Sequence, residues 1–334
     1  MIPKGLRRNL VPLAAQGYAL VCALATTVLL ARHLGTDSFG RFVVLPTLGM
    51  LGGEVASGGY SRVRARIVPK LRVRGRPSGM AVLSCSAGTL AIALPLTALS
   101  IWGFALLDRG TDLDADMALA ARWVLAIIPF AAFLALASAV FFANRHTGAA
   151  SLPDRVIRPT LFLGALLLAM QTGASVGLLG LGFFLSYLLT ALFSLILLVG
   201  LLRREDGFRR WPDGRHLKIY FRYSINYWYS TFLVAFRERS VMLLFGLVGS
   251  PVQVSLYAAS NRIVVTMRTF FNITRNTYQS QLAEGYSQGN YGRISRVYQS
   301  IVAQQAVLAI PVIGLFVLVP SLWGVIFGEE FAGV

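Results

Sequence analysis

The Lys and Arg residues of this chain alternate between loops. Long apolar runs are separated by short polar segments, and the basic residues fall almost entirely on every second segment. An apolar run of about 20 residues predicts a spanning helix, because a helix satisfies its own backbone hydrogen bonds inside the bilayer. The pattern therefore predicts an all-α polytopic membrane protein.

The apolar runs predict about nine transmembrane helices. We expect them at about 11–31, 42–60, 80–107, 118–143, 157–171, 175–202, 222–248, 253–281 and 297–320. The loops on one side carry most of the basic residues, whereas the opposite loops carry only Arg32, Arg41 and Arg109. Because basic loops stay cytoplasmic, the N-terminus, which lies on the basic side, is predicted to be cytoplasmic.

The net charge of +17 could indicate nucleic-acid binding in a soluble protein. Here only 13% of the residues are charged, and the cations sit in short loops between apolar runs. That arrangement favours contact with anionic membrane lipids of the inner leaflet and argues against a nucleic-acid partner.

The only long polar stretch between spans covers residues 203–221, and it predicts a basic cytoplasmic linker. Residues 1–202 before it are expected to form a six-helix lobe, and residues 222–334 after it an incomplete second lobe. Tight outer hairpins at Gly35 and at Gly249 begin alike, so the helices after the linker look like a parallel repeat of the first three. Such repeats are typical of transporters with a cavity between two halves.

Charges inside predicted spans are costly and usually face a water-filled cavity. Arg237, Glu238 and Arg239 lie near the middle of the 222–248 span. The next span carries a polar stripe at helical spacing, which includes Asn261, Arg268, Asn272 and Arg275. We interpret these residues as a cationic substrate cavity, because a guanidinium binds phosphate oxygens in a bidentate way. Two alternatives stay open: Arg275 snorkels to the interface, and Arg237 and Arg239 pair with Glu238.

Glu54 is the only acid inside a predicted span of the first lobe, and it sits in the glycine-rich segment 52–59. Glu54 and Glu238 are therefore candidates for binding a coupling proton or cation. A structural hydrogen bond is the alternative role for Glu54, and the spacing of Gly49 and Gly53 predicts close helix packing there.

Four patches of sequence resemble the multidrug/oligosaccharidyl-lipid/polysaccharide (MOP) flippase superfamily, most of all its bacterial polysaccharide and O-antigen flippases. The patches are residues 31–40 (ARHLGTDSFG), 155–159 (RVIRP), 256–262 (LYAASNR) and 326–331 (IFGEEF). The resemblance covers the whole chain. It implies two six-helix lobes, so a chain that ends after about nine helices is expected to be a fragment or a truncated product.

The resemblance implies a flippase of the bacterial inner membrane. It would move polyprenyl-pyrophosphate-linked oligosaccharide to the outer leaflet by alternating access, for polysaccharide, O-antigen or capsule export. The implied partners are that lipid-linked glycan, anionic membrane lipids, and a polysaccharide polymerase with its export machinery. A drug or metabolite antiporter of the same superfamily is the first alternative, although it would favour an acidic cavity.

A membrane glycosyltransferase or polymerase is the enzymatic alternative. It would need sizeable outer loops with catalytic residues, and the outer loops here are short. The sequence shows no nucleophile elbow, phosphate-binding loop or metal-ligand spacing, and its three His residues lie in separate loops. We therefore predict a protein that is not an enzyme and needs no cofactor or metal.

Overall fold

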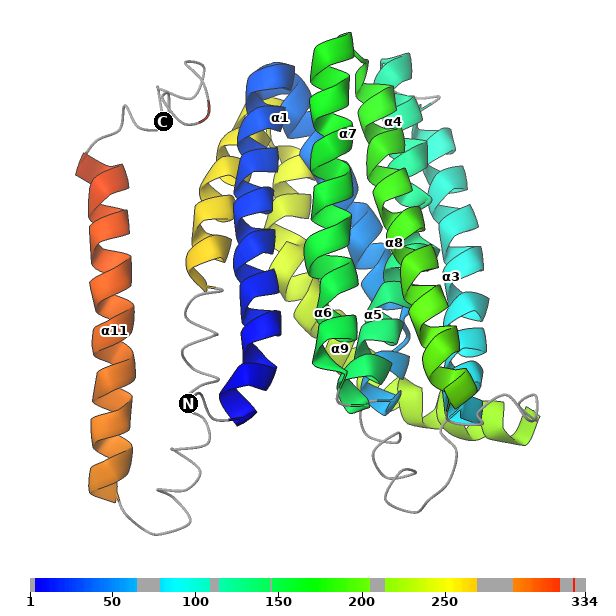
Figure 1. The fold of residues 1–334 in the computed structure, drawn as a ribbon. Helices are drawn as coiled ribbons and strands as arrows, with labels where there is room; N and C mark the ends of the chain where they lie inside the picture. Colours follow the sequence, from blue (N-terminus) through cyan, green and yellow to red (C-terminus); the bar gives the residue numbers. More distant parts are fainter. Residues whose placement is uncertain are drawn as a thin grey trace.

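The computed structural model describes residues 4–64, 79–108, 114–144, 146–204, 214–268, 291–318 and 327. Within these residues all regular structure is helical, and most of the helices stand side by side in one bundle (Figure 1). Four helical stretches are long and apolar enough to cross a membrane, namely Ala14–Ala56, Ala81–Leu106, Ala115–Ala143 and Val176–Arg203. The prediction of an all-α, multi-pass membrane protein is confirmed. The predicted cytoplasmic location of the N-terminus stays a prediction.

The first two predicted spans form one element, α1 (Lys4–Ala56), which is broken at a single residue. Gly35 has φ 71° and ψ 173°, a conformation that glycine adopts without the steric cost of a Cβ. Figure 1 shows the chain rising to the upper end of the bundle and then returning. The tight hairpin predicted at this glycine is therefore present, with a shorter connection than the spans at 11–31 and 42–60 implied.

The next helices are α3 (Gly79–Asp108), α4 (Ala115–Leu125) and α5 (Ile128–Ala143). The span predicted at 118–143 is thus two helices rather than one. Pro129 lies in the first turn of α5, where its missing N–H breaks the hydrogen-bond ladder of a continuous helix.

The span predicted at 157–171 begins earlier than the sequence indicates. Helix α6 (Thr147–Leu152), the π-helical turn η1 (Pro153–Ile157) and α7 (Arg158–Thr172) follow each other directly. Arg155, which lies between the predicted spans 118–143 and 157–171, is therefore helical. π-Helical turns are frequent at functional sites, and this one starts at Pro153.

Helix α8 (Val176–Arg204) matches its predicted span, but α9 (Gly214–Val248) begins within the predicted linker. The second half of that linker is thus helical, and in Figure 1 the first turns of α9 lie across the lower end of the bundle. A further helix covers residues 251–268. Helix α11 (Tyr291–Leu318) stands to one side of the bundle in Figure 1.

Glycines let the second half of α1, and the turn that follows it, pack closely against α5 and α9. A Cβ on Gly53 would lie 2.6 Å from the Cβ of Ala131 in α5. A Cβ on Gly59, where φ is +73°, would lie 2.6 Å from the carbonyl oxygen of Ser224 in α9. The close packing predicted for the Gly49–Gly53 spacing is confirmed, and it fixes the position of Glu54 between α5 and α9.

The two hairpins that the sequence relates to each other meet in space. Gly40, just after the break in α1, packs its backbone directly against the carbonyl of Pro251, just after the end of α9. The contact joins α1 to the segment that carries α9 and the 251–268 helix.

Candidate functional site

A cavity of about 340 Å³ lies where α1 meets α9 and the helix over residues 251–268, and we call it the central cavity. Its walls are Thr27, Val43, Pro46, Thr47, Met50, Glu238, Arg239, Met242, Ala258, Asn261, Arg262, Val265 and Arg268. Both legs of α1 contribute to one wall, and α9 and the 251–268 helix form the other.

The walls of the central cavity carry more cations than anions. Three arginines line it, Arg239, Arg262 and Arg268, against one carboxylate, Glu238. The Arg268 Nη2 atom lies 3.6 Å from the Glu238 Oε1 atom. Arg262 donates from its Nε atom to the Thr27 hydroxyl at 2.9 Å. A partly polar lining with surplus positive charge suits an anionic ligand.

Arg239 connects the central cavity to a second pocket. Its Nη2 atom lies 2.6 Å from the Glu54 Oε1 atom, which forms an ion pair between α9 and α1. Its Nη1 atom lies 3.6 Å from the Met50 sulfur. Among the described residues its buried Nε has no hydrogen-bond partner, so the guanidinium keeps a donor available.

The second pocket, which we call the N-terminal pocket, has a volume of about 290 Å³. It lies among α1, α5, η1 and α8, with Arg239 of α9 at one side. Its polar lining includes Glu54, Asp154, Arg155, Arg158 and Tyr187. Arg158 donates from Nε to Asp154 Oδ1 at 2.8 Å, and its guanidinium lies 4.8 Å from the centre of the Tyr187 ring. Each acid of this pocket is therefore paired with an arginine.

The structure brings together three of the predicted cavity residues, Arg239, Asn261 and Arg268, and adds the ion-coupling candidate Glu238. Arg237 is exposed and lies outside the walls of both pockets. Residues two apart on a helix point about 200° away from each other, so Arg237 and Arg239 cannot face the same cavity. Asn272 and Arg275 lie outside the described residues.

The ion pairs differ from the pairing that the sequence suggested within α9. Glu238 approaches Arg268 on the next helix, and Arg239 turns to Glu54 on α1. Neighbours along a helix point in different directions, so the partners of these charges come from other helices.

Sequence reasoning missed Arg262 because it lies about 100° from the Asn261–Arg268 stripe on an ideal helix. It also missed the ion pair in the N-terminal pocket. Asp154 and Arg158 have the i, i+4 spacing of a helical ion pair, and that signal was available in a segment assigned to a loop.

The fold is similar to solved transporters of the MOP superfamily. One, from Pyrococcus furiosus, is described as having a binding pocket of reverse polarity that suggests a different function. It is 15% identical with a TM-score of 0.60, over 97% of this chain and 74% of its own.

Two further structures are inward- and outward-facing conformations of a multidrug resistance MATE family transporter of that superfamily. The inward-facing one is 16% identical with a TM-score of 0.62, over 99% of this chain and 78% of its own. The outward-facing one is 16% identical with a TM-score of 0.61, over 98% of this chain and 76% of its own. At these identities the likeness establishes the fold.

A scan against protein-family models finds no match, and no curated protein sequence matches the chain.

Proposed function

We propose that this chain acts as a transporter that moves an anionic amphiphile across the membrane through the central cavity. The substrate class we propose is a polyprenyl-pyrophosphate-linked oligosaccharide, flipped from the inner to the outer leaflet. The observation that carries the proposal is the surplus of guanidinium groups on the cavity walls, with Arg239, Arg262 and Arg268 facing a single carboxylate.

A pyrophosphate group matches these side chains chemically. An arginine at the middle of a bilayer costs about 3 kcal/mol or more unless its surroundings are polar. Three such residues on one cavity are best explained by an anion that they bind together. Guanidinium groups stay charged at any physiological pH, and each can hold two phosphate oxygens at once.

The ion pairs around the cavity offer a way to couple binding to movement. Glu54 on α1 and Arg239 on α9 are 2.6 Å apart, so this pair links two elements that must move relative to each other in alternating access. An incoming pyrophosphate competes with Glu54 for Arg239, and with Glu238 for Arg268. A displaced carboxylate is then free to take up a proton or a cation, which is the coupling role we propose for Glu54 and Glu238.

A multidrug antiporter is the second candidate function, and one observation favours it. The N-terminal pocket contains two acids, Glu54 and Asp154, which could attract an organic cation. Both carboxylates hold an arginine in this structure, at 2.6 Å and 2.8 Å. A cationic substrate would have to displace those arginines into an already cationic region, so we rank this function second.

The test uses the full chain in proteoliposomes that contain a fluorescent polyprenyl-pyrophosphate oligosaccharide. Accessibility of the label to an added quencher reports movement between the leaflets. We expect Arg262→Ala and Arg268→Ala each to slow this movement about tenfold or more, because charge-assisted hydrogen bonds to phosphate are lost. Arg237→Ala is the matched control, since it removes an arginine from the same membrane region outside the cavity.

Two outcomes would contradict the proposal. Wild-type rates for both cavity variants would remove the arginines from the transport path. Efflux of a cationic dye that depends on Glu54 and Asp154, without movement of the lipid-linked glycan, would favour the antiporter.

A further inference from the structure

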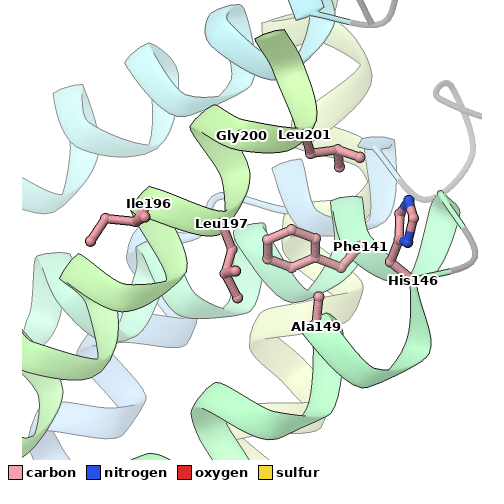
Figure 2. A pocket seen from close by; sticks show the side chains of 7 residues that line it. All are labelled: Phe141, His146, Ala149, Ile196, Leu197, Gly200 and Leu201. Atoms are coloured by element: carbon pink, nitrogen blue, oxygen red, sulfur yellow. The ribbon is translucent and has the colours of Figure 1, made fainter. Parts of the chain in front are cut away.

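A third pocket, which is mostly apolar, lies at the lower end of the bundle, away from the central cavity. It is formed where α5 ends, α6 begins and α8 approaches its last turn, and it has a volume of about 420 Å³. Figure 2 shows its walls, which are Phe141, His146, Ala149, Ile196, Leu197, Gly200 and Leu201. We call it the α5–α8 groove. Six of its seven lining residues are apolar, and His146 is the single polar one.

The α5–α8 groove has a closed floor and an open side. Phe141 is 2% exposed and belongs to a buried apolar cluster beneath the groove. Ile196 is 70% exposed, so the wall that it forms faces outward, toward the lipid in a membrane. At Gly200 a Cβ would meet no atom within 4 Å, which leaves the groove open at that point.

Just past one end of the apolar groove, the chain becomes basic. Ile196 and Leu197 line the part that lies deeper in the bundle, and α8 ends at Arg203 and Arg204, within about one turn of Gly200. His146 is exposed at the same end, and Arg203 is exposed as well. The loop charges predict that this end faces the cytoplasm, where the inner leaflet is anionic.

We propose that the α5–α8 groove binds one acyl chain of an anionic membrane phospholipid, with the phosphate of that lipid near His146 and Arg203. The apolar walls match a hydrocarbon chain, and the basic end matches an anionic headgroup at the depth where headgroups lie. This site is separate from the central cavity, and it does not depend on the transported substrate.

The experiment is native mass spectrometry of the full chain released from nanodiscs. The discs contain equal amounts of phosphatidylglycerol and phosphatidylcholine with identical acyl chains. We expect the wild type to retain one phosphatidylglycerol in preference to phosphatidylcholine. Gly200→Leu fills the groove and should lower that retention about fivefold or more. Gly164→Leu on α7 is the matched control, because a Cβ there also meets no atom within 4 Å and it is not in the groove.

Two further variants distinguish binding of the acyl chain from binding of the lipid headgroup. Ala149→Leu narrows the groove from the opposite wall and should lower retention of both lipids, even if Gly200→Leu does not fold. His146→Gln combined with Arg203→Gln should remove the preference for phosphatidylglycerol and leave the groove intact.

Several results would overturn the proposal. The first is unchanged phosphatidylglycerol retention in both groove-filling variants. The second is an equal retention of the two lipids by the wild type. The third is displacement of phosphatidylglycerol by added polyprenyl phosphate, which would make the groove part of the substrate path.

Discussion

Two regions of this molecule hold arginine side chains in opposite ways. Arg64, which lies past the end of α1, is 0% exposed. Its guanidinium donates hydrogen bonds to the backbone carbonyls of Val82 and Leu136. It also donates to the Ser86 hydroxyl at 2.6 Å. At the central cavity, Arg239 and Arg268 instead pair with side-chain carboxylates, those of Glu54 and Glu238, at 2.6 Å and 3.6 Å.

The difference separates a cation that holds the fold from cations that can exchange partners. Burial lowers the pKa of Arg64 to about 10, because the charged form loses its hydration, so the side chain stays protonated at neutral pH. Its partners are backbone carbonyls that cannot move away without local unfolding. The partners of the cavity arginines are side chains, which an anionic ligand can replace.

The largest expected effect on stability comes from replacing Arg64, the arginine whose contacts hold the fold. Arg64→Ala leaves the carbonyls of Val82 and Leu136 without their donor and creates a void. We expect it to destabilise the protein by about 3 kcal/mol or more. Thermal unfolding in detergent measures this, and Arg262→Ala serves as the control, expected near the wild-type midpoint. Equal losses of stability in the two variants would erase the distinction between the regions.

A smaller effect on stability is expected at Gly53, where α1 packs against α5 next to Glu54. Gly53→Ala places a Cβ 2.6 Å from that of Ala131, so α1 and α5 must separate. We expect a loss of about 1–3 kcal/mol, the usual cost of overpacking. Gly103→Ala in α3 meets no atom within 4 Å and should leave the unfolding midpoint unchanged. A neutral Gly53→Ala would show that the crossing is looser than its distances imply.

The architecture could be predicted from the sequence, whereas the pairing of charges could not. Hydropathy and the basic loops gave the all-α membrane fold, and the glycine spacing gave the close approach at Gly53. The helical segment before Arg158 was missed, because the π turn that starts at Pro153 interrupts the helical period. The partner of Arg239 was missed because Glu54 is far away in sequence and becomes a neighbour only through tertiary packing.

The smallest expected effect concerns the ion pair between α1 and α9. Glu54 is 37% exposed and Arg239 is 22% exposed, so solvent screens their attraction. A double-mutant cycle with Glu54→Gln and Arg239→Gln should give a coupling energy of about 1 kcal/mol in the unfolding free energy. A coupling several times larger would make this pair as rigid as the Arg64 contacts and would argue against its exchange during transport.

The most direct test of the central claim is the affinity of the nanodisc-embedded full chain for a polyprenyl pyrophosphate, compared across three forms. We expect Arg262→Ala to bind about tenfold more weakly than the wild type, because a cation of the cavity is lost. We expect Glu54→Gln to bind more tightly than the wild type, because Arg239 no longer has a competing carboxylate. Equal affinities in all three forms would contradict the account and leave the cavity arginines with a structural role alone.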